Sequence, residues 1–474
     1  MSFNSLADLL LSQRDDTIIA FDADGDISWQ QFVLDVRHLI QAINSKPCQS
    51  IAICCDDSYF FLVAFFATIY ANKKVVLPGN HQPAMLLSLA SEFDLLIDDG
   101  QVTQAAEKDL TQQLFQQTSI TLPLTKQSLT SVADVDFFAL DLTAIEITLF
   151  TSGSTGTPKA IKKTLLSLQE EVQNLQDNFG HFLAHSRVVS TVSHQHIYGL
   201  LFRVLWPLCA GTAFARKDII YPEQVIANGT MQHTLISSPA LLKRLLDEGQ
   251  QGHYCAVFSS GGPLSSAASD LCKQLLNQTA IEVFGSTETG GIGYRQQQTA
   301  ESVWTFFSKV IIKLNADNCL LLNSPWLSEK LDVTLADAAS VDGYYQTSDQ
   351  CELLDNHQFR LKGRVDHIVK IEEKRVSLIE VETHLNALEW ISESAVVVVT
   401  EPHRTTLGAL LALTAQGEQQ LATLGKGKFW IKLRQSLRDW VEPVAIPRHF
   451  RIAPEIPMNR QGKRLQQEIA GLFK

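Results

Sequence analysis

Short apolar runs alternate with amphipathic stretches along most of the chain. The runs rich in β-branched residues, which are typical of buried strands, are Ser50–Cys54, Lys74–Leu77, 145–150, 187–192, His233–Ser237, Ala256–Ser259 and 281–284. Helical patterns are found at 240–246 and 264–276, and the continuous apolar run at 59–70 predicts a buried helix. This alternation predicts βαβ units, with a largely parallel sheet between helices. The predicted fold class is therefore α/β.

The pattern changes near residue 360. Residues 359–374 are dense in charge, and an amphipathic stretch at 378–388 is followed by a very apolar strand at 395–400. A last helix is expected at 428–440. We therefore predict a large N-terminal domain over residues 1–362 and a small α/β domain over residues 363–474.

Composition excludes several classes of protein. Hydrophobic residues make up 45% of the chain and charged residues 19%, so a large core is expected, and disorder or collagen-like repeats are excluded. Acidic residues exceed basic ones, 51 against 39, which gives a net charge of −12 and argues against a nucleic-acid partner. The run at 59–70 is shorter than the roughly 20 residues that a membrane span needs, so we expect a buried helix instead.

The eight cysteines include no C-x-x-C pair and no zinc-finger spacing. The start of the chain has neither a basic region nor a cleavage site typical of a signal peptide. We therefore expect reduced thiols and a cytoplasmic location.

A loop rich in glycine and hydroxyl residues follows the strand at 145–150. It comprises Thr151, Ser152, Gly153, Ser154, Thr155 and Gly156, with Lys159 shortly after. Glycines permit close backbone approach, successive N–H groups can surround an anion, and the lysine adds positive charge. The loop therefore suits a polyphosphate, although its glycine and lysine are not adjacent as a Walker A loop requires.

Further segments carry complementary chemistry. In FGSTETGG at 284–291, Phe284 can stack on a base and Glu288 can ligate Mg²⁺ beside a phosphate. In YQTSD at 345–349, Asp349 can accept hydrogen bonds from a ribose, and Arg364 in GRVDHIVK can reinforce it. A lysine, Lys463, ends the segment PMNRQGK at 457–463.

The order and spacing of these segments resemble those of the adenylate-forming superfamily over residues 27–463. That superfamily includes acyl-CoA synthetases, aryl-CoA ligases, luciferases and the adenylation domains of peptide synthetases. The resemblance implies a large domain of parallel-rich sheets and a small mobile C-terminal lid, here in a shortened form. It also implies an AMP-forming acid–thiol ligase that uses ATP and Mg²⁺ and has a small carboxylic acid as substrate.

Roles follow position by position from the resemblance. The segment from Thr151 to Lys159 would hold the ATP phosphates, and Glu288 would hold Mg²⁺. The adenine site would be formed by Gly261, Gly262, Pro263, Phe284, Gly285, Ser286 and Thr287. Asp349 and Arg364 resemble the ribose clamp, Asp366 the interdomain hinge, and Lys463 the lysine that steadies the carboxylate and α-phosphate during adenylation.

The acyl pocket is the least defined part of the resemblance. His196 resembles the gate residue beside that pocket, and the expected lining includes Tyr198, Gly199, Ser238, Phe258, Gly290 and Gly291. These positions are nearly neutral and combine small residues with aromatic ones. An aryl acid is therefore favoured, and a fatty acid is the alternative.

Departures from the family pattern concern the acceptor of the acyl group. Glu373 replaces the usual glycine in a loop that lines the pantetheine tunnel of relatives, and Ser348 replaces another glycine. The stretch between Glu288 and Asp349 is also short for the family. We therefore keep two acceptors open, CoA and the phosphopantetheine of an acyl carrier protein.

Two other functions compete with the ligase. A non-catalytic descendant would bind the nucleotide or the acyl adenylate as a sensor, since a fold does not fix a function. Retention of Lys159, Glu288, Asp349, Arg364 and Lys463 together argues against it. A luciferase-like oxygenation is the more remote alternative.

Overall fold

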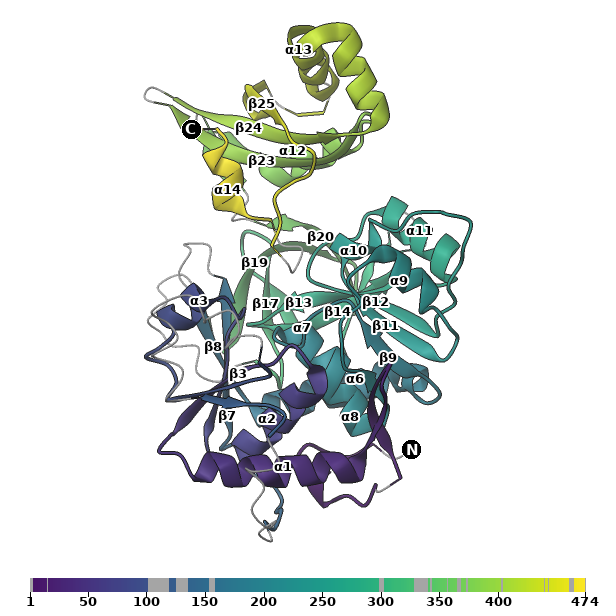
Figure 1. The fold of residues 1–474 in the computed structure, drawn as a ribbon. Coiled ribbons are helices and arrows are strands. Elements are labelled where there is room, and N and C mark those ends of the chain that lie inside the picture. The colour runs from purple at the N-terminus through teal and green to yellow at the C-terminus, as the bar shows by residue number, and fades with distance from the viewer. Residues whose placement is uncertain are drawn as a thin grey trace. The chain divides into compact units, whose positions relative to one another are not determined.

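The computed structural model divides into two compact units, Met1–Val310 with Ser324–Ala336 and Ile311–Asn323 with Asp337–Lys474 (Figure 1). The residues that it describes are 3–14, 16–100, 119–124, 135–152, 158–297, 302–327, 340–341, 343–355, 357–364, 368–371, 374–401, 404–438, 440–441, 443–459 and 464–473. The α/β fold class is confirmed.

The first unit contains a six-stranded sheet in the order β6-β5-β3-β4-β7-β8. Its strands are β3 (Ser50–Cys54), β4 (Lys74–Leu77), β5 (Leu95–Asp98), β6 (Ser119–Thr121), β7 (Glu146–Ser152) and β8 (Pro158–Thr164). All neighbouring pairs are parallel except β7 and β8, which form an antiparallel pair. The expected strands at Ser50–Cys54 and Lys74–Leu77 are confirmed.

Helix α2 (Ser58–Tyr70) packs against this sheet and against α1 (Trp29–Asn44). The Asp57 side chain caps α2 by accepting from the backbone N–H of Tyr59 at 2.9 Å. Nearly every residue of α2 is buried, which explains why its sequence has no polar face. The buried helix expected at 59–70 is thus confirmed. Among the described residues, no helix has both the length and the apolar content of a transmembrane span.

A second sheet of the first unit runs in the order β15-β14-β13-β12-β11-β9-β10-β1-β2. The strands are β1 (Ile18–Asp22), β2 (Gly25–Ser28), β9 (Arg187–Ser190), β10 (Phe214–Ala215), β11 (His233–Ser237), β12 (Ala256–Ser259), β13 (Ile281–Ser286), β14 (Gly290–Gln296) and β15 (Trp304–Phe306). From β1 to β13 the pairing is parallel, while β2, β14 and β15 are antiparallel to their neighbours.

The helices of the first unit differ in part from the expected ones. They include α3 (Pro83–Ser88), α6 (Leu165–Leu183), α7 (Ile197–Gly199), η4 (Leu200–Leu205), α8 (Trp206–Ala210), α9 (Pro222–Ala227), α10 (Pro239–Leu242) and α11 (Ser266–Leu276), with a short 3₁₀ turn η1 (Leu9–Leu11). The helix expected at 240–246 is shorter than predicted, because α10 ends at Leu242. Helix α6 was not predicted, since its glutamine-rich sequence hides the apolar face that packs on α8 and η4.

The second unit begins with antiparallel strands: β16 (Ile311–Leu314), β17 (Cys319–Asn323), β18 (Ser340–Val341), β19 (Tyr344–Leu353) and β20 (Gln358–Arg364). The rest comprises β21 (Ile368–Ile371), β22 (Lys374–Ser377), α12 (Leu378–Asn386), β23 (Ile391–Glu401), β24 (Arg404–Leu413), α13 (Ala415–Arg438), η6 (Pro443–Ala445), β25 (His449–Ile452) and α14 (Gln466–Gly471). Helix α13 is broken at Gly425, whose φ of 71° is left-handed.

Strand β23 explains the apolar run expected at 395–400. Val396 belongs to one core cluster, together with Phe429 of α13, while Val397 belongs to another, together with Ile469 of α14. A strand covered on both faces needs apolar residues at every position rather than at alternate ones.

Candidate functional site

The strands that flank the expected phosphate loop lie side by side. Thr151 and Ser152 end β7, Lys159 is the second residue of β8, and Thr151 is paired with Lys159 in register. The two ends of the loop are therefore adjacent at one end of this hairpin. The loop residues Gly153, Ser154, Thr155 and Gly156 lie outside the described residues, as does the Ser152 side chain.

A salt bridge joins Lys159 to Glu288, a residue far away in the sequence. The distance from Lys159 Nζ to Glu288 Oε1 is 3.0 Å, and the Glu288 side chain is only 20% exposed. Burial raises the pKa of Glu288, but the hydrogen bond and charge of Lys159, with a hydrogen bond from Ser286, outweigh this, so the pKa lies below its ordinary value. Glu288 is consequently an anion at neutral pH.

Glu288 is carried by a tight turn between β13 and β14. Ser286 N–H donates to Thr289 Oγ1 at 3.0 Å, and Thr289 N–H donates to Ser286 Oγ at 3.1 Å. The turn requires glycine at two positions that lie close in space, Gly285 and Gly290. A Cβ at Gly285 would lie 2.2 Å from the carbonyl oxygen of Gly290, which itself has a φ of +63°.

Beneath this turn lies a ring of buried hydrogen bonds that sequence reasoning did not find. Lys163 Nζ donates to Trp326 O at 2.8 Å and to Glu288 O at 3.4 Å. Trp326 Nε1 donates to Gly291 O at 3.0 Å, and Gly291 N–H donates to Glu171 Oε1 at 2.5 Å. Lys159 and Lys163 share one face of β8, so both reach Glu288, one its carboxylate and the other its carbonyl.

Both charged members of this ring are fully buried. Burial lowers the pKa of Lys163 against the opposing charges of Glu171 and Glu288. Burial likewise raises the pKa of Glu171, against the charge of Lys163 and the hydrogen bond from Gly291. In the sequence, only Lys163 indicates the ring, because it is a lysine at an inward-facing position of a strand. The adjacent Lys162 makes this signal hard to recognise.

The segment expected at the adenine follows β12. An added Cβ at Gly261 or Gly262 would meet no atom within 4 Å, so open space lies over both glycines. Pro263 is exposed beside them. Ser260 Oγ fixes the start of this segment to β13 by donating to Val283 O at 2.8 Å. The space suits close approach of a flat ring.

The other adenine-site residues lie at the end of β13. Phe284 is half-buried, and its ring centroid is 5.6 Å from that of Trp304. Gly285 and Ser286 are exposed, and Thr287 is half-buried. These residues border the turn that carries Glu288, so the expected base and metal segments lie at the ends of the neighbouring strands β12 and β13. The salt bridge of Lys159 and Glu288 joins them to the phosphate-loop hairpin, which belongs to the other sheet.

His196 lies just before α7, as the residue that precedes its first turn. Its neighbour His194 is the histidine that is held rigidly. His194 Nδ1 lies 2.9 Å from Ser58 Oγ and its Nε2 lies 2.8 Å from Cys55 O. Burial lowers the pKa of His194 well below its ordinary value, so the ring is neutral. It therefore fixes the loop before His196 to the N-terminus of α2.

The residues expected in the acyl pocket are connected through aromatic contacts with α6. The Phe258 ring lies 5.2 Å from Phe179 of α6 and 5.4 Å from Phe202, and the Phe202 ring lies 4.8 Å from Tyr198. Gly290 and Gly291 face Glu171 of α6. Gly199 is the last residue of α7, where a Cβ would lie 2.1 Å from Ser193 O, and Ser238 precedes α10.

The expected ribose clamp lies in the second unit. Asp349 of β19 is paired in register with Arg364 of β20, and Arg364 Nη1 lies 3.3 Å from Asp349 Oδ1. The backbone N–H of Asp349 donates to Thr347 Oγ1 at 3.1 Å. The hinge residue Asp366, the adenylation lysine Lys463 and the tunnel residue Glu373 lie outside the described residues.

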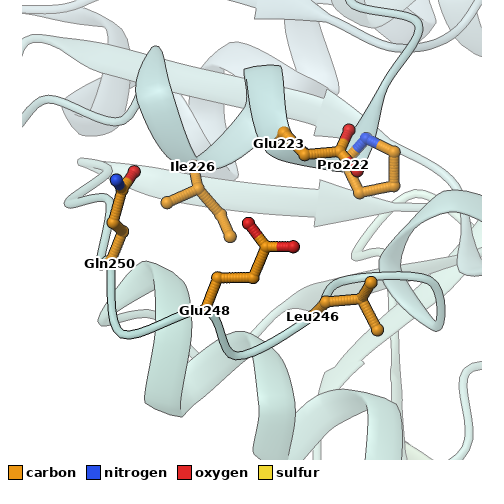
Figure 2. Close-up of a pocket in the computed structure, with 6 residues that line it drawn as sticks. All are labelled: Pro222, Glu223, Ile226, Leu246, Glu248 and Gln250. Atoms are coloured by element: carbon orange, nitrogen blue, oxygen red, sulfur yellow. The ribbon is translucent and has the colours of Figure 1, made fainter.

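A shallow pocket elsewhere on the first unit contains none of the expected site residues. It is lined by Pro222, Glu223, Ile226, Leu246, Glu248 and Gln250 (Figure 2). Its lining combines two carboxylates and no cation, which does not suit a polyphosphate.

The described residues contain no cluster of three or more side chains able to hold a metal by themselves. Glu288 is a single ionised carboxylate at a strand end. Mg²⁺ usually takes one or two protein carboxylates and completes its shell with waters and substrate phosphates. The donor set therefore fits a magnesium ion that arrives with a nucleotide.

Comparison with known proteins gives a consistent assignment. A model of the family described as "AMP-binding enzyme" matches residues 10–310. A 4-coumarate–CoA ligase of Halorhodospira halophila is 27% identical over 324 residues, covering 67% of this chain and 74% of the relative. ATP-bound MatB of Rhodopseudomonas palustris superposes with a TM-score of 0.83 at 17% identity, with full coverage of both chains.

O-succinylbenzoate-CoA synthetase of Bacillus subtilis, in complex with AMP, superposes with a TM-score of 0.77 at 17% identity, covering 98% of both chains. These solved structures share the fold. The family match spans more than half of the chain, including the phosphate loop and the Glu288 turn. The chain belongs to the AMP-binding enzyme family.

Proposed function

We propose that this chain activates an aryl acid as its acyl adenylate, releasing pyrophosphate, and then transfers the acyl group to a pantetheine thiol. The observation that carries the proposal is the salt bridge between Lys159 and Glu288. It places a cation from the end of the phosphate loop beside an ionised carboxylate from the β13–β14 turn. A triphosphate and its metal need both charges at one place.

In the adenylating step, a carboxylate oxygen of the acid attacks the α-phosphorus of ATP, and the bond to the pyrophosphate oxygen breaks. Negative charge gathers on the phosphoryl oxygens in the transition state, so cations and N–H donors placed there lower the barrier. Lys159 and the phosphate-loop amides hold the β- and γ-phosphates, and Lys463 steadies the carboxylate and the α-phosphate. Magnesium, when bound at Glu288, would supply further positive charge to the phosphates.

The nucleoside is held by the remaining expected residues. The adenine lies over Gly261 and Gly262, where the structure leaves open space, and stacks on Phe284. Asp349 accepts hydrogen bonds from the ribose hydroxyls, and Arg364 holds that carboxylate. Residues 363–474 act as the lid domain with its hinge at Asp366, and His196 gates the acyl pocket. The lid changes position between the two half-reactions.

The acid is proposed to be aromatic because of the rings around the expected pocket. Phe258 is buried against Phe179, Phe202 and Trp206, and the half-buried Tyr198 contacts Phe202. Aromatic side chains favour offset or edge-on contacts with another ring. Two of the names support an aryl acid, a 4-coumarate–CoA ligase and an O-succinylbenzoate-CoA synthetase, whereas other relatives are acetyl-CoA synthetases.

The acceptor is proposed to be the phosphopantetheine of an acyl carrier protein, with free CoA as the second candidate. Glu373 stands where relatives have a glycine in the loop along the thiol tunnel. A carboxylate there repels the adenosine phosphates of CoA, whereas a carrier protein presents a single phosphodiester.

ATP–pyrophosphate exchange in the presence of Mg²⁺ tests the adenylating step. The protein is screened with pooled benzoates, cinnamates and fatty acids, and the active acid is then supplied with CoA or a phosphopantetheinylated carrier protein. We expect exchange with an aryl pool, its loss in Lys463→Ala, and thioester formation on the carrier. Exchange with fatty acids alone contradicts the aryl assignment. ATP binding without exchange for any acid favours a sensor.

A further inference from the structure

The inner face of α6 lies against the residues expected to line the acyl pocket. Gly291 N–H donates to Glu171 near the start of the helix, and Phe179 contacts Phe258 near its end. Asn174 is buried one helical turn after Glu171 and lies on the same face of the helix as Glu171. Helix α6 therefore contributes two polar side chains to a region that is otherwise apolar and aromatic.

Each of these two side chains has one polar atom without a hydrogen-bond partner. Glu171 is 4% exposed and Asn174 is 2% exposed, and neither Glu171 Oε2 nor Asn174 Nδ2 has a partner among the described residues. Leaving a buried donor or acceptor unpaired destabilises a protein. Unpaired polar atoms in such a place need an explanation, and a ligand is one.

The other polar atom of each side chain is occupied, which fixes the orientation of both. Glu171 Oε1 accepts from Gly291 N–H at 2.5 Å. Asn174 Oδ1 accepts from Asn178 Nδ2 at 3.2 Å. The unpaired atoms are consequently an acceptor, Oε2, and a donor, Nδ2.

We infer that Glu171 and Asn174 are specificity-determining residues that bind a hydroxyl substituent of the acid. A hydroxyl can donate one hydrogen bond and accept another, so one group satisfies both Glu171 Oε2 and Asn174 Nδ2. An ether accepts only, an ammonium donates only, and a hydrocarbon satisfies neither. The inference rests on the proposed function and narrows its substrate to a hydroxylated aryl acid.

The position of Oε2 gives this inference a geometric basis. A Cβ built on Gly290 would lie 2.8 Å from Glu171 Oε2, and one on Gly291 would lie 3.3 Å from Oε1. The Gly290 Cβ would also lie 2.4 Å from Trp326 Cδ1, so the carboxylate packs beside the Trp326 ring directly against two expected pocket glycines. Any side chain at either glycine would cover the oxygens.

Matched acids test the inference without relying on any variant. ATP–pyrophosphate exchange is measured with benzoate, cinnamate, their hydroxylated forms and their methoxylated forms. Sites that hydrogen-bond a substrate hydroxyl reject the analogue that lacks it by large factors. We expect kcat/KM for a hydroxylated acid to exceed that for the unsubstituted and methoxylated acids by at least about 100-fold.

Two variants assign the preference to these residues. Glu171→Gln keeps the shape of the side chain, and Asn174→Leu removes the donor; each is expected to lower the ratio of hydroxylated to unsubstituted acid at least about tenfold. The control is Glu170→Gln, because Glu170 is the neighbouring carboxylate on α6 and pairs instead with Lys309 at 2.6 Å. It should keep the wild-type ratio.

The outcomes separate this inference from the proposed function. Exchange by the wild type with no preference for a hydroxyl overturns the inference alone. The same holds if both variants slow all acids equally, which would indicate a purely structural role with water as the occupant. Absence of exchange with every acid, in protein that binds ATP, overturns the proposed function as well.

Discussion

At the scale of single residues, the charge on Glu288 is set by its neighbour Lys159. The salt bridge of 3.0 Å keeps the pKa of Glu288 below its ordinary value despite burial. We predict that Glu288→Gln lowers pyrophosphate exchange by about 100-fold or more and raises the magnesium concentration needed for half-maximal exchange. Glu146→Gln is the control, since Glu146 pairs with Lys162 on the same hairpin at an exposed position. Equal rates in both variants would remove Glu288 from the site.

His194 gives a prediction about stability and pH. Its neutral ring satisfies both Cys55 O and Ser58 Oγ. His194→Leu leaves Ser58 Oγ unpaired and leaves Cys55 O with only the 3.5 Å contact of Gln195 Nε2, so we expect the free energy of unfolding to fall by about 1–3 kcal/mol in denaturant titrations. His185→Leu, at an exposed position, should change it by less than about 0.5 kcal/mol.

The pH dependence follows from the lowered pKa of His194. Below about pH 6.5 the unfolded chain binds a proton that the folded chain excludes. This contribution to stability is therefore complete above about pH 6.5 and is lost as the pH falls, by up to about 1.4 kcal/mol per pH unit. The slope should be smaller in His194→Leu. An unchanged slope would mean that the folded protein accepts the proton.

Substitutions at two glycines distinguish a role in ATP binding from a role in packing. Gly262 has open space around it, so Gly262→Val should leave the free energy of unfolding within about 0.5 kcal/mol and weaken ATP binding at least about tenfold, measured by calorimetry. Gly199→Ala places a Cβ 2.1 Å from Ser193 O and should lower stability by about 1–3 kcal/mol. Unchanged ATP affinity in Gly262→Val would argue against the adenine site.

At the scale of elements, the buried ring of Lys163, Trp326, Gly291 and Glu171 ties β8, the β13–β14 turn and α6 together. Removing one partner from buried charges usually destabilises by about 3–5 kcal/mol. We expect this loss for Lys163→Met, partial recovery in Lys163→Met with Glu171→Gln, and no loss for Lys162→Met, whose side chain is half exposed. A Lys163→Met protein as stable as the wild type would contradict the account.

The sequence predicts the elements whose burial is uniform. The strands β3 and β4 and the buried helix α2 consist of runs of apolar residues, and such runs predict buried elements directly. The phosphate-loop strands and the Glu288 segment were found through their unusual glycine and hydroxyl content. The pairing of Asp349 with Arg364 follows from the register of an antiparallel pair.

Helix α6 and the ring beneath Glu288 show what the sequence does not predict. The inner face of α6 contains Glu171 and Asn174, which the sequence alone would place on the surface of a polar helix. Their burial depends on glycines 290 and 291 and on Trp326, all distant in sequence. Such polar interiors depend on tertiary contacts, which hydrophobic periodicity cannot reveal.

At the scale of the whole molecule, the residues of the proposed site are distributed over both units. The first carries the salt bridge of Lys159 and Glu288, and the second carries the pair of Asp349 and Arg364. In the proposed function, the first pair serves the phosphates and the metal, and the second pair serves the ribose. The central claim is that the acid is activated by attack on the α-phosphorus of ATP.

Transfer of oxygen from the acid to AMP tests this claim most directly. The preferred aryl acid, labelled with ¹⁸O in its carboxylate, is incubated with the enzyme, ATP, Mg²⁺ and the thiol acceptor. The masses of AMP and pyrophosphate are then measured by mass spectrometry. Attack on the α-phosphorus leaves one carboxylate oxygen on the phosphate when the thiol displaces AMP, so we predict AMP with a single ¹⁸O and unlabelled pyrophosphate. Unlabelled AMP, or label in inorganic phosphate formed together with ADP, would contradict the account.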